Sequence, residues 1–140
     1  MKGHENMEMD QKRIPLLQAM GYSEKAIQFI MNKTNVGEIA SPSVSAKNQG
    51  TCGDIMILYL TIEQNIIIEA KYDYIGCAGL QAAASALTEM IKGKTVKNAQ
   101  KIDSGDILNF LGGLPEQKHE CALLASTTLK KAIEVYFSQN

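Results

Sequence analysis

The sequence lacks any apolar run of the roughly 18–20 residues that a membrane-spanning helix needs, so we expect no transmembrane segment. It also lacks an excess of charge, because 14 Lys and Arg stand against 15 Asp and Glu and the formal net charge is −1. A nearly neutral chain gives no electrostatic reason to expect nucleic acid or an anionic membrane as a partner. The N-terminal region lacks the uninterrupted apolar stretch of a signal peptide and is too acidic for a transit peptide, so we expect a cytoplasmic protein.

Cysteine is scarce: the chain has three, and no two of them form a Cys-x-x-Cys pair. Without such a pair, a thiol oxidoreductase is the function that we favour least. An odd number of cysteines in a reducing compartment argues against a disulfide framework and for free thiols or metal ligands. The 140 residues, 45% of them apolar, suffice for one globular domain with a substantial core.

The order of the strand and helix patterns predicts an α+β fold, in which helices cover one face of a small antiparallel sheet of about three strands. Residues 40–50 are rich in Ser, Asn, Pro and Gly, and we expect a loop there. Apolar, β-branched runs predict strands at 55–62 and 66–70, and residues 72–75 extend the second strand or form a third.

From Ala78 onward the apolar residues recur at helical spacing. We expect one helix of about fifteen residues that Gly93 ends, and then two short ones. The last helix is expected to begin near Pro115 or Glu116. Residues 1–21, where Pro15 interrupts an apolar stripe, are interpreted as an N-terminal extension of a domain that covers 22–140.

Each cysteine lies at the edge of a predicted element. Cys52 is in a loop two residues before Asp54, Cys77 lies between a strand and a helix, and Cys121 is near the start of the last helix. Taken separately, each has an ordinary interpretation as a turn residue, a small buried side chain or part of a solvated helix start. Together they can converge at one end of the sheet and bind zinc or an iron–sulfur cluster.

Three side chains are candidates for a fourth ligand. We rank Asp54 first and treat Glu120 and His119 as exchangeable or neighbouring groups. On a helix, Glu120 lies closer to Cys121 than His119 does. Imidazole, however, is a better ligand than carboxylate at a borderline-soft site, so the choice stays open.

Several short motifs occur in a consistent order along the chain. They are Tyr22-Ser23-Glu24-Lys25, Thr51-Cys52-Gly53-Asp54, Tyr74-Ile75-Gly76-Cys77, Lys92-Gly93-Lys94-Thr95 and Cys121-Ala122-Leu123-Leu124-Ala125. In these motifs the chain resembles the iron–sulfur cluster assembly scaffolds, IscU and the N-terminal domain of NifU, over about residues 22–133.

Two positions depart from the family pattern. The family has a histidine directly before the third cysteine, where this chain has Glu120, with His119 one residue earlier. The chaperone-recognised Leu-Pro-Pro-Val-Lys of the family corresponds here to Leu114-Pro115-Glu116-Gln117-Lys118. The second change makes the use of a specialised chaperone doubtful.

The resemblance implies a scaffold, not an enzyme, on which a transient [2Fe–2S] cluster is built and handed on to apo iron–sulfur proteins. A cysteine desulfurase would present a persulfide, a scaffold thiolate would accept its sulfane sulfur, iron would bind beside it, and reduction would give bridging sulfide. Cys52, Asp54, Cys77 and Cys121 would hold the iron, and zinc is a further candidate for this site in the purified protein. A homodimer is left open.

Two of these residues have physical reasons for particular roles. Cys121 is the candidate sulfur acceptor, because the start of a helix is expected to be partly exposed and its dipole favours the thiolate. The hard carboxylate of Asp54 is expected to keep the site labile beside soft thiolates.

Two alternative functions remain. One is a zinc-binding sulfur acceptor similar to the SufU proteins, and the other is a metal-stabilised interaction module without cluster traffic. The segment between Cys77 and Cys121 lacks the long insertion of the SufU proteins, which argues against that branch.

Overall fold

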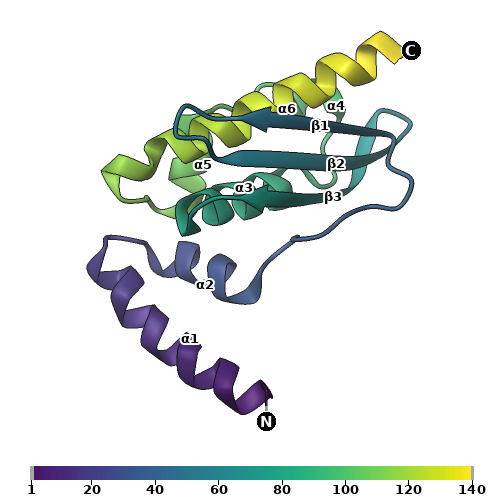
Figure 1. Cartoon of the computed structure of the whole chain (residues 1–140). Helices are drawn as coiled ribbons and strands as arrows, with labels where there is room; N and C mark the ends of the chain where they lie inside the picture. The colour runs from purple at the N-terminus through teal and green to yellow at the C-terminus, as the bar shows by residue number, and fades with distance from the viewer. Residues whose placement is uncertain (1, 140) are drawn as a thin grey trace.

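A three-stranded antiparallel sheet and the helices packed against it make up the fold (Figure 1), which confirms the predicted α+β class. The computed structural model describes residues 2–139 and the side chains of residues 11–139. The strand order is β1-β2-β3. The elements are α1 (Lys2–Ala19), α2 (Glu24–Asn32), β1 (Val44–Gln49), β2 (Ile55–Glu63), β3 (Ile66–Ile75), α3 (Ala78–Ile91), α4 (Val96–Ala99), α5 (Ser104–Leu111), the 3-10 helix η1 (Glu116–Lys118) and α6 (His119–Gln139).

One face of the sheet is buried and supplies much of the core. Along β2 the side chains alternate, and Met56, Leu58 and Leu60 are fully buried. Leu58 pairs with Ala46 of β1 on one side and with Tyr72 of β3 on the other, so the same face continues across all three strands. Helices α3 and α6 pack on this face. This matches the prediction that helices cover one side of the sheet.

Helix α3 lies at the centre of the molecule and contacts β3, α2, α5 and α6. Four of its alanines have no exposed surface, namely Ala82, Ala83, Ala84 and Ala86, and such small residues allow neighbouring elements to approach a helix closely. The hydroxyl of Tyr72 donates to the carbonyl of Gln81 at 3.0 Å and shares a hydrogen bond of 2.7 Å with Ser85. These bonds tie β3 to α3, so the short link between them is held in place.

The predicted loop at 40–50 is wrong for residues 44–49, which form β1. Ser45, Lys47 and Gln49 point to the exposed side, while Val44 and Ala46 are buried. The alternation of buried and exposed residues was not recognised, because most residues of this segment are polar. Pairing with the strongly apolar β2 stabilises a strand that its local propensity alone would not. Residues 72–75 are part of β3 and do not form a separate strand.

Two helix boundaries also differ from expectation. The last helix begins at His119, because residues 116–118 form a turn of 3-10 helix after Pro115. Pro15 lies inside α1 and does not end it. Leu17 near the end of α1 is buried in the core, so this end of the expected extension is packed onto the domain.

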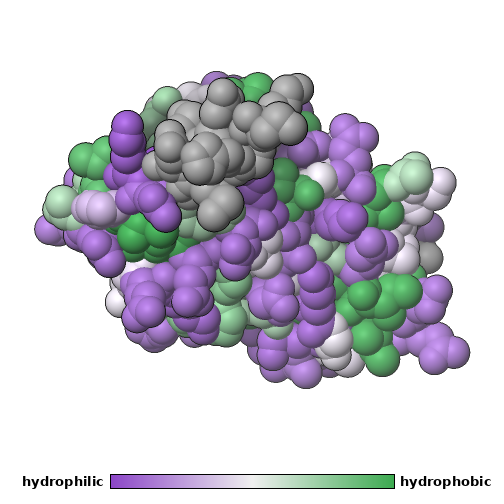
Figure 2. Space-filling view, turned by 90° about the horizontal axis from the view of Figure 1, so that it is seen from below, coloured by the Kyte–Doolittle hydropathy of each residue, from purple (hydrophilic) through white to green (hydrophobic). Residues whose placement is uncertain are grey.

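No helix among the described residues is long and apolar enough to cross a membrane. Figure 2 shows the molecule from below, on the side where α1 and α2 lie in Figure 1. Hydrophilic residues cover most of this face, and the hydrophobic ones gather in separate small areas.

Candidate metal site

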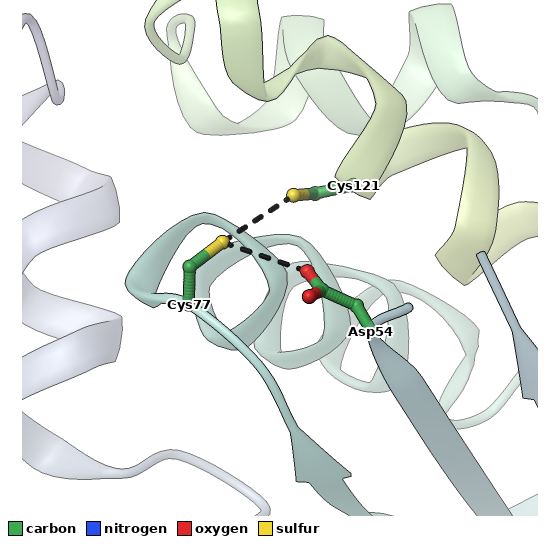
Figure 3. A group of neighbouring side chains, drawn as sticks. All are labelled: Asp54, Cys77 and Cys121. Atoms are coloured by element: carbon green, nitrogen blue, oxygen red, sulfur yellow. Dashed lines mark hydrogen bonds between the residues drawn. The ribbon is translucent and has the colours of Figure 1, made fainter. Parts of the chain in front are cut away.

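Asp54, Cys77 and Cys121 meet at one end of the sheet and are called the ligand group below (Figure 3). Asp54 directly precedes β2, Cys77 is the N-cap of α3, and Cys121 is in the first turn of α6. The Cys77 sulfur lies 3.7 Å from Oδ2 of Asp54 and 3.7 Å from the Cys121 sulfur. One ligand atom from each residue lies within 4.8 Å of the others.

Strand register explains why Asp54 and Cys77 are neighbours. Ile55 at the start of β2 pairs with Ile75 at the end of β3, so the residues just outside the strands lie side by side. A Cβ atom on Gly76 would be 2.9 Å from Cγ of Asp54. Glycine at this position therefore lets the carboxylate approach Cys77.

Cys77 and Cys121 form a thiolate–thiol pair. A hydrogen bond from Cys121 lowers the pKa of Cys77 to about 5, against the opposing effect of burial, with help from the N–H groups of Leu80 and Gly79 at the start of α3 and from the charge of Lys118. The same bond, together with burial, raises the pKa of Cys121. The two sulfurs therefore share one proton through this hydrogen bond.

The expectation that Cys121 is partly exposed is wrong for this structure. Its exposed fraction is 8%, and the hydrogen bond with Cys77 together with burial raises the pKa of its thiol. The thiolate at a helix N-terminus is Cys77, which is half-buried. Cys121 follows η1 in the first turn of α6 and is one of the buried residues of that helix.

Cys52 lies in the turn between β1 and β2 and is exposed. It lines the same cleft of about 120 Å³ as the ligand group, but its sulfur is not among the atoms that lie within 4.8 Å of one another. Glu120 also lines this cleft and accepts a hydrogen bond from Cys52 at 3.4 Å. The three cysteines thus face one cleft, with Cys52 at its rim.

His119 does not line the cleft. Its Nε2 atom is 3.2 Å from the carbonyl oxygen of Leu114, so the ring braces the segment that leads into α6. Of the three candidates for a fourth ligand, Asp54 is the one placed within the ligand group.

Two residues near the thiols were not recognised from the sequence. The stem of Lys118 packs on Gly79, where an added Cβ would be 3.0 Å away, and this holds its charge near Cys77. Tyr22 is buried, and burial followed by electrostatic interaction with the Cys77 and Cys121 thiol groups raises the pKa of its phenol to about 12. No local signal in the sequence connects either residue with the cysteines.

The spacing of the ligand group fits a tetrahedral metal. With metal–sulfur bonds of 2.3 Å and metal–oxygen bonds of 2.1 Å, a tetrahedron has edges of about 3.8 Å between sulfurs and about 3.6 Å between sulfur and oxygen. The two distances from the Cys77 sulfur are both 3.7 Å, and the third edge, between Asp54 and Cys121, is within 4.8 Å. A tetrahedral ion held by these two sulfurs and one oxygen would have one further coordination position.

A profile of the NifU-like N-terminal domain family matches residues 21–140. The chain belongs to this family. It is 40% identical over 120 residues to the iron-sulfur cluster assembly scaffold protein IscU 1 of Archaeoglobus fulgidus, covering 85% of this chain and 78% of that protein. It is 38% identical over 125 residues to the scaffold protein IscU of Rickettsia prowazekii, covering 84% of this chain and 92% of the relative.

The fold is also found among solved structures. A crystal structure described as an iron-sulfur cluster assembly scaffold protein for the SUF system, from Fervidobacterium islandicum AW-1, superposes with a TM-score of 0.68 at 26% identity. The match covers 80% of this chain and 96% of the other. The fold is therefore shared between proteins assigned to different assembly systems.

Proposed function

We propose that this protein is a scaffold on which an iron–sulfur cluster is assembled and from which it is passed to other proteins. The observation that carries the proposal is the ligand group: two sulfurs and a carboxylate with tetrahedral spacing at an open cleft, in a member of the NifU-like N-terminal domain family. Relatives of this family are named as scaffolds, and the function requires no enzymatic turnover by the protein itself.

The finer proposal concerns the cargo and the residues that hold it. The cargo is a transient [2Fe–2S] cluster, and its ligands are Cys52, Asp54, Cys77 and Cys121. Asp54 favours release, because a hard carboxylate binds soft iron–sulfur centres less firmly than a fourth thiolate does. Glu120 is a neighbour of this set through Cys52.

The proposed partners are a cysteine desulfurase, which supplies sulfur as a persulfide, and apo iron–sulfur proteins, which receive the cluster. A specialised chaperone stays doubtful because the segment Leu114–Lys118 departs from the family motif. A cytoplasmic location stays a prediction.

Cys121 stays our proposed sulfur acceptor, and the structure adds a condition to this proposal. Because Cys121 is buried and lines the cleft, a persulfide has to enter the cleft to reach it. Persulfide transfer can be followed by mass spectrometry of the three cysteine peptides. Label that appears on Cys52 or Cys77 in a Cys121→Ser variant at the parental rate would move the acceptor role to that residue.

A zinc-binding sulfur acceptor is the second candidate. It is supported by distances that match a tetrahedral zinc site. Anaerobic incubation with desulfurase, cysteine and ferrous iron separates the two functions. The scaffold develops the visible absorption of a [2Fe–2S] cluster, whereas a zinc-bound sulfur acceptor gains persulfide without visible colour.

A further inference from the structure

Glu120 connects the start of α6 to the turn that carries Cys52. Its Oε2 atom accepts hydrogen bonds from the hydroxyl of Thr51 at 3.1 Å and from the thiol of Cys52 at 3.4 Å. Within the part of the chain that the structure describes, each of these bonds is the one side-chain hydrogen bond that Thr51 or Cys52 makes. One carboxylate oxygen therefore fixes two side chains of this turn.

The base of the same turn is fixed by other contacts. The N–H of Gly50 donates to the carbonyl of Asp54 at 2.8 Å, and the N–H of Gly53 donates to the carbonyl of Gly50 at 3.1 Å. Gly50 also packs closely on Leu124 of α6, where an added Cβ would be 3.2 Å from Cδ2. The backbone of the turn is thus anchored to α6, and Glu120 determines where the Cys52 side chain points.

The Glu120–Thr51 contact lies at the wall that two neighbouring hollows share. Glu120 and Thr51 line both the cleft of about 120 Å³ that contains the ligand group and a second hollow of about 210 Å³ beside it. The second hollow does not include Cys52, Cys77 or Cys121 among its lining residues. Gly50 and Leu124 line both hollows as well, so the two spaces share the wall formed by this turn and the first turns of α6.

We propose that Glu120 is a latch that competes with the metal for Cys52. With the latch closed, Cys52 stays at the rim, and the ligand group offers two sulfurs and one carboxylate. With the latch open, Cys52 can enter the fourth position. The inference rests on the proposed function, because it assumes that the ligand group receives metal.

Ligation by Cys52 replaces its S–H···O contact with a sulfur–metal bond. The thiol proton passes to water, a sulfur lone pair forms the new bond, and nothing is oxidised or reduced. The reverse exchange is a first step of metal release. Cys52 leaves the metal, takes up a proton from water and forms its hydrogen bond with Glu120 again, while the ligand group stays in place. Glu120 is therefore a positioning residue, acting through Cys52.

The test is the affinity of the full-length protein for Zn²⁺ in a Glu120→Ala variant, measured by competition with a chelator. The variant loses the hydrogen bond from the Cys52 thiol to the charged Glu120 carboxylate, so the thiol is free to bind the metal. The strength of such a bond is enough for its loss to tighten zinc binding about tenfold. Glu120→Gln, which keeps a neutral acceptor, should fall between parent and Glu120→Ala. Glu116→Ala removes the same charge from an exposed position outside the cleft and should leave the affinity unchanged.

The deciding comparison is made in a Cys52→Ser background. There, Glu120→Ala should have no effect on zinc affinity, because the latch acts only through the Cys52 sulfur. With Co²⁺ as the probe, the sulfur-to-cobalt charge-transfer band of the parent should weaken on Cys52→Ser. Circular dichroism establishes that each variant is folded.

Three outcomes would overturn the latch. They are weaker zinc binding by Glu120→Ala, the same tightening in the Cys52→Ser background, or a cobalt band that Cys52→Ser leaves unchanged. All of these measurements use zinc or cobalt and no desulfurase. A protein that passes them but builds no iron–sulfur cluster would therefore refute the proposed function and leave the latch intact.

Discussion

The sulfur atoms of Cys77 and Cys121 lie 3.7 Å apart and hold one proton between them in the folded protein. This relationship prepares one thiolate for a metal ion at neutral pH, while the second thiol must still lose its proton when metal binds. Metal binding by the pair should therefore release a proton and become tighter as the pH rises.

The shared proton also makes stability depend on pH. Cys77 loses its proton near pH 5 in the folded protein but only near its ordinary pKa of 9.0 in the unfolded chain. Between these values the unfolded chain binds more protons, so the free energy of unfolding should rise with pH. Above about pH 9 it should fall, because both thiols ionise in the unfolded chain while folded Cys121 keeps its proton.

Urea unfolding of the metal-free protein at several pH values checks this expectation. The difference between the parent and a Cys77→Ala, Cys121→Ala double variant isolates the contribution of the pair. A difference that does not change between pH 5 and 9 would contradict the thiolate–thiol assignment.

Asp54→Ala should make the bound iron–sulfur cluster more persistent. The carboxylate is a hard ligand among soft thiolates, and its removal leaves the position to a softer donor. The half-life of the visible absorbance under air should lengthen in the variant. Glu63→Ala, which removes a carboxylate from the exposed end of β2, serves as the control. A shorter half-life for Asp54→Ala than for the parent would show that the carboxylate stabilises the cluster.

The same substitution should weaken zinc binding on the order of 100-fold, because zinc loses a ligand of the tetrahedral set. His119→Ala should change the zinc affinity little, since the ring is bonded to the carbonyl of Leu114 and lies outside the cleft. Chelator competition at neutral pH measures both. A large loss for His119→Ala with little change for Asp54→Ala would reverse our ranking of the fourth ligand.

Gly76→Ala should weaken zinc binding about tenfold, as expected for a change that displaces a ligand without removing it. The new methyl group would lie 2.9 Å from Cγ of Asp54, so the carboxylate must move away from Cys77. In an Asp54→Ala background the same substitution should have little further effect on zinc affinity. A full effect in that background would mean that Gly76→Ala acts on the backbone of the Cys77 turn.

Sequence patterns predicted the parts of the fold where local signals are strong. The apolar runs of β2 and β3 and the helical spacing after Ala78 have no competing interpretation. The polar strand β1 was missed because its stability comes from pairing with β2, as in the register of Ala46 with Leu58. The start of α6 was misplaced because Pro115 suits a helix start in sequence, but is followed by a 3-10 turn.

The convergence of the candidate site residues was predictable, but the geometry between them was not. Cys52, Asp54, Cys77 and Cys121 all line one cleft, as their positions at element edges suggested. Which sulfur is buried, which one carries the proton, and which one Glu120 holds all depend on contacts between residues 44 to 68 positions apart. Such contacts follow from packing and are not encoded in local patterns.

The most direct test of the scaffold function is transfer of a cluster to an apo-ferredoxin under anaerobic conditions. The protein is first loaded with desulfurase, cysteine and ferrous iron, freed from these reagents by gel filtration, and mixed with the apo-ferredoxin. We expect the visible spectrum to change from that of the scaffold to that of the ferredoxin, faster than with equal amounts of free iron and sulfide. Cys77→Ala should neither load nor transfer. A protein that gains no visible absorption, or that keeps its cluster while the ferredoxin stays colourless, would contradict the account.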